Sequence, residues 1–300
     1  MLKRSDFLIK KRIRLLSVLI AIVFVSLASL TSANAVTTFT YGAYTFADID
    51  DNYVSLYGYD NSSDNLEVPA EFSGRYVKSI YDYAFENNTI ITKLDFSKVS
   101  KKFKAIGINS FAGCTGLTGE LMLPSSITSI GESAFFGCSG LETVLLYCAV
   151  KAIPSECFNR CSSIETVRIS NTTQKIENLA FANCPSIKEV FIPFSVTEIS
   201  ENAFLNDNHV VLKCYTGSYA QQFAIDNGIS YDLVDLKPGD ADLNGVININ
   251  DATMAQMHDV KLIELSDLEK KAADVSRDGD VTVRDATLIQ MYLANIITGF

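Results

Sequence analysis

Two twelve-residue segments near the C-terminus carry the side chains best suited to hold a metal ion. Each begins and ends with aspartate, has glycine at position 6, and places oxygen-bearing side chains at positions 1, 3, 5, 9 and 12. Calcium takes six to eight oxygen ligands, and this spacing wraps them around one ion. We therefore expect two calcium ions, held by Asp240, Asp242, Asn244, the Val246 carbonyl, Asn248 and Asp251 in the first loop, and by Asp274, Ser276, Asp278, the Asp280 carbonyl, Thr282 and Asp285 in the second.

The two segments differ at position 3, where Asp242 of the first loop corresponds to Ser276 of the second. A neutral ligand holds calcium less strongly, so the second site is expected to be the weaker one. The alternative is that both segments are acidic surface loops without a metal. Both are followed by the same sequence, Asp-Ala-Thr-x-x-Gln-Met, at residues 251–257 and 285–291, and this repeated unit favours metal binding.

The elements around the loops indicate a particular kind of module. An EF-hand commonly has a helix before each loop and glutamate at position 12, whereas here position 12 is aspartate and no helix is expected before the first loop. A capping box from Ser266 to Glu269 predicts a middle helix. A helical apolar face is expected near the end, at Leu288, Ile289, Tyr292, Leu293 and Ile296. In these features residues 239–300 resemble a type I dockerin, with two loop–helix repeats joined by a middle helix.

The resemblance to dockerins implies a partner, the cohesin module of a scaffolding protein in a cellulosome. It also implies that recognition centres on loop positions 10 and 11 and on the following helix, in either repeat. Ile249, Val283, Met257 and Met291 would form an apolar anchor, and the alternative is that they are ordinary helix surface. The residues at the matching positions are Ile249, Asn250, Gln256, Met257 and Lys261 in the first repeat, and Val283, Arg284, Gln290, Met291 and Asn295 in the second.

A phenylalanine recurs every 23 to 26 residues along the middle of the chain, and cysteine follows three positions later in four copies. Alternating Val-x-Ile segments predict short strands, and Ala-Phe-x-x-Cys segments predict tight turns or single helical turns. The period is typical of leucine-rich repeats, which bury their apolar faces only by stacking. The recurring residues are Phe85, Phe111, Phe135, Phe158, Phe181 and Phe204, with Cys114, Cys138, Cys161 and Cys184.

These repeats resemble the leucine-rich repeats of bacterial surface-antigen adhesins. The resemblance rests on Ile-Gly-Glu-Ser-Ala-Phe-Phe-Gly-Cys at residues 130–138 and on Ile-Pro-Phe-Ser-Val at residues 192–196. Residues 38–60 resemble the opening β-hairpin of such arrays, and residues 214–234 resemble their closing cap. The likeness implies a solenoid fold, but arrays of this kind serve many partners.

The seven cysteines are an odd number, so at least one is unpaired in an exported protein. The four that share a repeat position are expected to stack as inward-facing free thiols, with a bridge between neighbouring repeats as the alternative. Cys157 and Cys161 have the spacing of a metal pair, but Cys157 stands where most other repeats have alanine and no second pair exists. A packing role is therefore favoured.

The N-terminus has the pattern of an export signal. Basic residues occur up to Arg14, residues 15–30 carry no charge, and Ala33-Asn34-Ala35 suits signal peptidase. We expect cleavage after Ala35 and no membrane span thereafter, with an uncleaved anchor as the alternative; either way residues 36–300 lie outside the cytoplasm. The formal net charge of −10 counts against a nucleic-acid partner.

We therefore expect an α+β protein with a signal peptide at residues 1–35, a capped leucine-rich-repeat domain at 36–235 and a small all-α dockerin at 236–300. No catalytic constellation stands out. A secreted, non-catalytic cellulosome component, held at the cell surface through the cellulosome, is favoured over a carbohydrate-active component in polysaccharide breakdown or a structural spacer. An outward-facing and largely apolar row suggests that the repeats contact a protein, cell-surface or polysaccharide ligand, with ordinary variation of a sheet face as the alternative: Met122, Leu145, Arg168 and Phe191.

Overall fold

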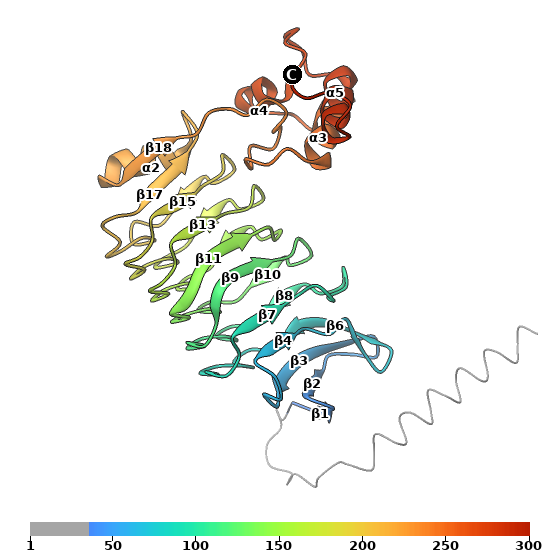
Figure 1. Cartoon of the computed structure of the whole chain (residues 1–300), viewed down its shortest axis with the longest axis vertical. Coiled ribbons are helices and arrows are strands. Elements are labelled where there is room, and N and C mark those ends of the chain that lie inside the picture. Colours follow the sequence, from blue (N-terminus) through green and yellow to red (C-terminus); the bar gives the residue numbers. More distant parts are fainter. Residues whose placement is uncertain (1–35) are drawn as a thin grey trace, which may run out of the picture.

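A computed structural model of the chain describes residues 36–300. They form a stacked array of short, mostly parallel strands, followed by a helical module at the C-terminal end (Figure 1). This confirms the expected fold class of a leucine-rich-repeat solenoid followed by a small α-helical module. The predicted export signal, residues 1–35, lies outside the described residues. No helix within residues 36–300 is long and apolar enough to cross a membrane.

The array opens with three antiparallel strands, in the segment that was expected to form a β-hairpin. They are β1 (Thr38–Tyr41), β2 (Tyr44–Asp48) and β3 (Tyr53–Tyr59). Gly42 makes the turn between β1 and β2 with a φ of 57°, a conformation that costs glycine little. Phe46 of β2 stacks on Phe72 with ring centroids 4.5 Å apart, which closes this end of the core.

The repeats place their strands in two long sheets and two short ones. One sheet has the order β1-β2-β3-β6-β8-β10, with β5 paired to β6, and another has the order β18-β17-β15-β13-β11-β9. The short sheets are β12-β14-β16 and β4-β7. The strands of the repeats are β4 (Asn65–Glu67), β5 (Glu71–Phe72), β6 (Arg75–Ile80), β7 (Lys93–Asp95), β8 (Ala105–Ile106), β9 (Thr118–Leu123), β10 (Ser129–Ile130), β11 (Gly140–Leu146), β12 (Ala152–Ile153), β13 (Thr166–Arg168), β14 (Lys175–Ile176), β15 (Glu189–Phe191) and β16 (Glu198–Ile199).

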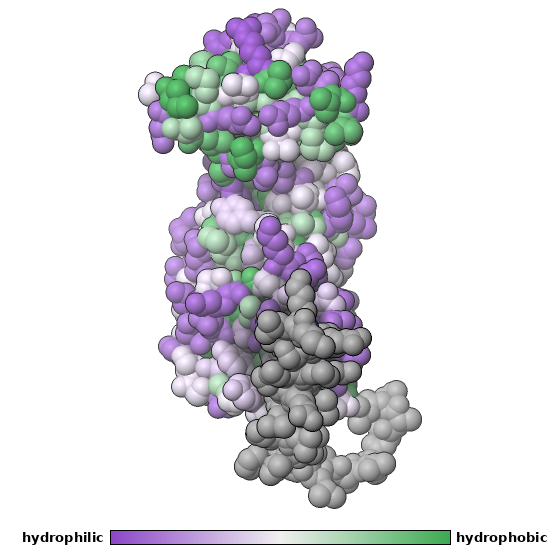
Figure 2. Space-filling model, turned by 90° about the vertical axis from the view of Figure 1, so that its right-hand side faces the viewer, coloured by the Kyte–Doolittle hydropathy of each residue, from purple (hydrophilic) through white to green (hydrophobic). Residues whose placement is uncertain are grey.

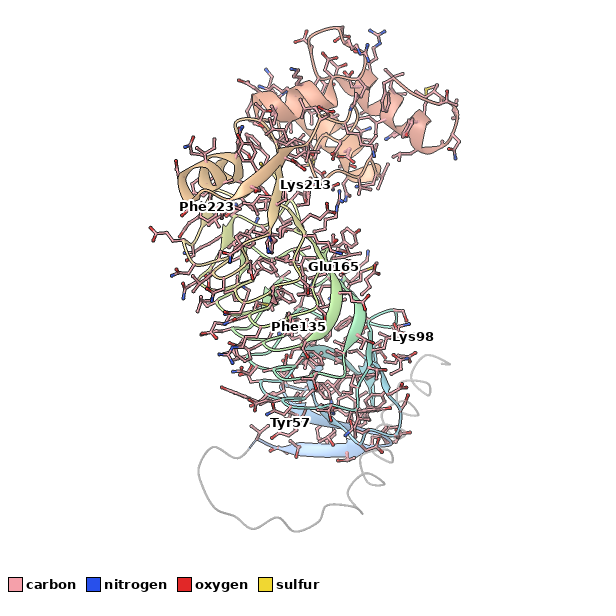
Figure 3. The ribbon with its side chains drawn as sticks, turned by 60° about the vertical axis from the view of Figure 1, so that its left-hand side comes forward. Tyr57, Lys98, Phe135, Glu165, Lys213 and Phe223 are labelled. Carbon is pink, nitrogen blue, oxygen red and sulfur yellow. The ribbon has the colours of Figure 1, made fainter. Side chains whose placement is uncertain are left out.

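The recurring phenylalanines form one continuous stack inside the array. Neighbouring ring centroids lie 5.2 to 5.8 Å apart from Phe85 to Phe204, with Phe135 in the middle of the stack (Figure 3). The Ala-Phe-x-x-Cys segments are turns rather than helices. All six rings are buried, so the array is held together by an apolar ladder that runs through every repeat.

The cysteines support the same core. All seven are free and buried. In the four copies at the shared repeat position, Sγ donates a hydrogen bond to the phenylalanine carbonyl of the preceding repeat, over 3.0 to 3.2 Å. Burial raises the pKa of the Cys114 thiol to about 12 and raises the pKa of Cys161 as well, so these thiols stay protonated and unreactive. Packing is therefore their role.

The array ends in two strands and a helix, in the segment that was expected to be its closing cap. It consists of β17 (Val211–Cys214), α2 (Tyr219–Asn227) and β18 (Ser230–Leu233), which pairs in parallel with β17. Ser218 caps the start of α2 by accepting a hydrogen bond from the Gln221 N–H, and Gly228 ends it with a φ of 64°. Phe223 of α2 is buried against the last repeats and seals the core (Figure 3).

The C-terminal module contains α3 (Ile249–Asp259), α4 (Asp267–Ala273) and α5 (Val283–Leu293). Its core is built mostly from small side chains, with α3 and α5 packed on one another. The predicted capping box is present, since Ser266 accepts from the Glu269 N–H and Glu269 accepts from the Ser266 N–H. The predicted apolar face of the last helix was too long: α5 ends at Leu293, and Ile296 is 67% exposed because the chain has already turned away.

Candidate metal-binding loops and docking surface

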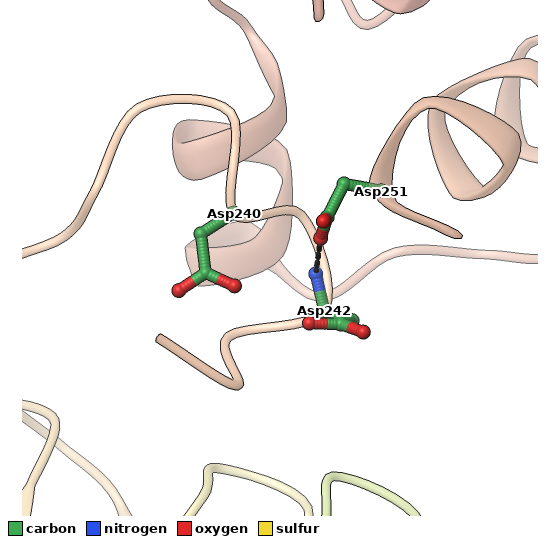
Figure 4. Close-up of side chains that lie close together, drawn as sticks. All are labelled: Asp240, Asp242 and Asp251. Carbon is green, nitrogen blue, oxygen red and sulfur yellow. Dashed lines mark hydrogen bonds between the residues drawn. The ribbon is translucent and has the colours of Figure 1, made fainter. Parts of the chain in front are cut away.

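Three carboxylates of the first loop converge on one point. Asp240, Asp242 and Asp251 each offer an oxygen within 4.8 Å of the others, and all three side chains are buried (Figure 4). Asp240 and Asp242 come from the loop itself, whereas Asp251 comes from the first turn of α3. The predicted spacing has therefore brought a loop and a helix start together around a cluster of oxygen donors.

Backbone N–H groups hold these carboxylates in place. The Asn244 N–H donates to Asp240 Oδ1 at 3.0 Å, and the Gly245 N–H donates to Asp240 Oδ2 at 2.7 Å. Asp251 closes the loop, because Oδ1 accepts from the Asp242 N–H at 3.1 Å and Oδ2 from the Asn248 N–H at 2.7 Å. Gly245 turns the chain with a φ of 82°, which explains the glycine at position 6.

The electrostatics of the first loop favour a cation. Desolvation and the charges of neighbouring carboxylates raise the pKa of Asp242, and desolvation also raises the pKa of Asp251. Grouped negative charges that are buried together repel each other and resist ionisation. An all-oxygen donor set of this kind fits a hard divalent ion such as calcium.

The other predicted ligands of this loop are engaged in local hydrogen bonds. Asn244 Oδ1 accepts from the Val246 N–H at 2.7 Å, and Asn248 caps α3 by accepting from the Asn250 N–H at 2.8 Å. The Val246 carbonyl accepts from Asn248 Nδ2 at 3.2 Å. These three groups shape the loop, while the convergent cluster is made by the three aspartates.

The second loop repeats the arrangement in a more exposed setting. Asp274, Asp278 and Asp285 offer oxygens within 4.8 Å of one another, but only Asp285 is buried. Ser276 donates its hydroxyl to Asp274 Oδ1 at 3.4 Å, and the side chain of Asp278 pairs with Arg284 at 3.1 Å. Thr282 caps α5 and Asp280 is exposed. The second cluster is thus similar in geometry and less enclosed.

The residues predicted to meet a partner are all accessible. At loop position 10, Ile249 is 58% exposed and Val283 is 56% exposed, and their neighbours Asn250 and Arg284 are exposed as well. Further along, Lys261 and Asn295 are exposed, whereas the four remaining residues are half-buried: Gln256, Met257, Gln290 and Met291. Apolar groups lie among hydrophilic ones on this module (Figure 2). The sequence prediction missed Leu262, which is 72% exposed just beyond α3.

The four residues predicted to form an outward row lie in register on successive strands, but the C-terminal module covers part of the row. Register pairs Met122 with Leu145, Leu145 with Arg168 and Arg168 with Phe191 on successive strands. Met122 is 49% exposed. Phe191 was expected to face outward, but it is only 9% exposed, because it packs with Tyr215, Leu243 and Ala272 in a cluster that joins the array to the C-terminal module.

Polar contacts reinforce this junction. Arg168 Nη2 donates to the Asn244 carbonyl at 2.8 Å, and the Tyr215 hydroxyl donates to Asp240 Oδ2 at 3.3 Å. The Arg168 guanidinium also lies over the Phe191 ring, 4.7 Å from its centroid. Burial and the charge of Asp240 raise the pKa of Tyr215, so its hydroxyl remains a donor. The sequence prediction missed this junction, since no local pattern links residues so far apart.

Comparisons with known proteins agree with both halves of the chain. The BspA type Leucine rich repeat region matches residues 77–210 in six copies, and the Dockerin type I domain matches residues 238–294. No curated protein matches the chain. Both matched modules are non-catalytic kinds of module, and type I dockerin domains are known to bind calcium.

Solved structures resemble the array. A leucine-rich repeat protein from Eubacterium ventriosum has 22% identity and a TM-score of 0.51, covering 60% of this chain and 46% of that one. A leucine-rich cell surface protein from Faecalibacterium prausnitzii has 22% identity and a TM-score of 0.44, covering 61% of this chain and 56% of that one. The chain thus spans about half the length of these relatives. At this identity the likeness to the Eubacterium ventriosum protein shows the fold alone.

Proposed function

We propose that this chain, which combines a BspA-type leucine-rich repeat region with a type I dockerin domain, is a secreted, non-catalytic component of a cellulosome. Its C-terminal module would dock on the cohesin of a scaffolding protein in a calcium-dependent manner, while the repeats would bind a ligand at the cell surface or on a polysaccharide. The corresponding parts are an export signal at residues 1–35, the repeat domain at 36–235 and the dockerin at 236–300. The convergence of three aspartates in each loop is the observation that carries this proposal.

The metal sites are proposed as two, one in each loop. Asp240, Asp242 and Asp251 would hold one ion, and Asp274, Asp278 and Asp285 the other. Asn244, Asn248, Ser276, Thr282 and the carbonyls of Val246 and Asp280 would complete the two sets. Bound calcium would supply positive charge that cancels the repulsion among these carboxylates.

Each loop ends where a recognition helix begins, and this links the ions to docking. Asp251 belongs both to the carboxylate cluster and to the capping box of α3, and Asp285 has the same two roles at α5. The exposed residues Ile249 and Val283 lie at the first helical position, two residues before these aspartates. Ordering the loops would therefore fix the angle at which α3 and α5 present their side chains to the partner.

On the repeats, the exposed end of the outward row is the proposed ligand-binding surface. Met122 is exposed and Leu145 is half-buried on adjacent strands β9 and β11, away from the part of the row that the C-terminal module covers. An apolar row on a sheet face is well suited to contact another molecule. Hydrolysis of a polysaccharide by the chain would contradict the non-catalytic proposal.

Binding of residues 36–300 to a panel of cohesins, with calcium and with a chelator, tests the proposal. We expect at least one cohesin to bind, and the chelator to abolish binding. The double variant Ile249→Asp/Val283→Asp should lose binding, because it places charge in both proposed anchors. Leu205→Asp is a matched control, since Leu205 is 44% exposed on the repeat array. Binding that persists in the chelator would refute the calcium dependence. Binding that persists in the double variant would refute the proposed surface.

A further inference from the structure

The two metal loops differ in what surrounds them. In the first loop, Leu243 is fully buried and Asn244 and Gly245 are half-buried. The corresponding residues of the second loop, Arg277, Asp278 and Gly279, are all exposed. The two loops have the same register and similar internal hydrogen bonds, so this difference comes from their surroundings rather than from their sequences alone.

The surroundings of the first loop are the last strands of the repeat array. Leu243 inserts into the cluster with Phe191 of β15 and Tyr215, which directly follows β17. Its backbone adopts a φ of 52°, and exposed Arg277 at the same position of the second loop has a φ of 60°, so this turn belongs to the loop itself while the burial of the Leu243 side chain comes from the array. The partly buried residues Phe194, Val234, Leu236 and Leu268 pack around the same cluster.

Polar groups of the array also reach into the loop. The Tyr215 hydroxyl donates to Asp240, which is one of the three clustered carboxylates, and Arg168 donates to the Asn244 carbonyl. The approach is close enough that a Cβ placed on Gly245 would collide with the Arg168 guanidinium. Glycine at this position therefore serves both the turn of the loop and the contact with the array.

We propose that the repeat array forms the outer shell of the first metal loop, so that ion binding by this loop and docking of the module on the array are coupled. This inference rests on the proposed calcium-dependent function. Tyr215 and Arg168 act as positioning residues: Tyr215 orients the Asp240 carboxylate, and Arg168 fixes the backbone between Asp240 and Gly245. Groups that orient a metal ligand commonly change its affinity by about 10-fold or more when removed.

The coupling must act in both directions. If the docked loop binds the ion more tightly, then an ion in the loop holds the module more firmly against the array by the same factor. A cavity of 540 Å³ borders the junction and is lined by residues of both parts, among them Arg168, Lys213 and Gly245. The contact therefore has open space on one side. The exposed second loop lacks such a partner.

Calcium titration of residues 36–300, followed by NMR, tests the proposal. Gly245 and Gly279 stand at position 6 of the two loops, so their amide signals report on each loop separately. In Tyr215→Phe and in Arg168→Ala, we expect the calcium concentration at the midpoint of the Gly245 signal change to rise about 10-fold. The midpoint concentration for Gly279 should stay within twofold of its value in the unaltered protein. Tyr215→Phe keeps the buried ring, so it removes only the hydrogen bond.

Lys175→Ala is the matched control for Arg168→Ala, because it removes a cation of the same repeat from β14, which belongs to a different sheet from β13, and Lys175 pairs with Glu198 rather than with the module. It should leave both midpoints unchanged. Equal shifts of both glycines, or no shift of Gly245 in either variant, would overturn the coupling. If neither glycine responds to calcium in the unaltered protein, the proposed function itself fails, which is a different result.

Discussion

The repeat array and the C-terminal module bury different kinds of side chain. The array buries stacked phenylalanines, aliphatic residues and cysteines from one end to the other. The module has a core rich in alanine, and it buries Asp240, Asp242, Asp251 and Asp285 almost completely. An apolar ladder is stable by itself, whereas grouped buried carboxylates need a cation. The comparison leads us to expect that one half of the chain is stable without an ion and that the other half depends on one.

Removal of calcium is the largest perturbation that distinguishes the two halves. Each ion held at a thousandfold excess over its Kd stabilises the folded state by about 4 kcal/mol, so two ions contribute about 8 kcal/mol to the module. We expect scanning calorimetry in a chelator to show the transition of the module lowered by tens of degrees or lost, with the transition of the array lowered far less. A chelator that lowers both transitions equally would break the comparison.

Removing one ring from the phenylalanine stack should have the reverse effect, because it destabilises the array and not the module. Phe135 is fully buried between Phe111 and Phe158. Phe135→Ala should destabilise the array by about 3–5 kcal/mol, because the cavity removes contacts on both sides. Denaturant unfolding followed by circular dichroism measures the loss. The calcium affinity of the second loop, followed at the Gly279 amide, should not change. A large change in that affinity would mean that the two halves do not fold separately.

One buried carboxylate makes the array itself sensitive to pH. Asp207 occupies the cysteine position of the last repeat, where Oδ1 accepts from the Cys184 N–H at 2.6 Å and Oδ2 is buried without a partner. Burial raises the pKa of Asp207 to about 7 from an ordinary value of 3.8. The folded state therefore binds a proton more tightly than the unfolded state, and stability falls as the pH rises from about 4 to about 7.

Asp207→Asn should remove this penalty, since the amide keeps the hydrogen bond to Cys184 without the charge. We expect the free energy of unfolding of the array to rise by roughly 1–2 kcal/mol at pH 8, with a smaller gain at pH 5. Denaturant titrations at the two pH values measure both. Asp226→Asn, on the exposed side of α2, is the control for loss of one charge. An equal gain at both pH values would contradict the assignment.

The helix caps offer the mildest and most local test of the comparison. Ser266 caps α4 in the module and Ser218 caps α2 in the array, each by accepting a backbone hydrogen bond. Replacing either serine by alanine should cost about 1 kcal/mol. In calorimetry, Ser266→Ala should lower only the transition of the module and Ser218→Ala only that of the array. A variant that lowers both transitions equally would contradict the comparison.

Repetition explains how much of this molecule could be predicted from its sequence. The 23-residue period identifies which face of each repeat is buried, so the stacks from Phe85 to Phe204 and from Cys114 to Cys184 follow directly. The aspartate spacing of the loops predicted which carboxylates meet, and the structure brings three together in each loop. Patterns of this kind are local, because neighbours in the sequence or one repeat apart are neighbours in space.

The junction could not be predicted for the same reason. Arg168 and Asn244 are 76 residues apart and belong to different patterns, so neither period nor spacing relates them. Phe191 was expected to face outward because its strand alternates, but the C-terminal module covers it. Ile296 looked like part of a helical face, although α5 ends three residues earlier. In each case a contact between distant parts, or the end of an element, overrides the local pattern.

Calorimetric titration of calcium into residues 36–300 tests the central claim most directly. The account predicts two ions per chain, with Asp240→Ala removing one and Asp274→Ala removing the other. Binding of a single ion, or no heat of binding in the unaltered protein, would contradict it.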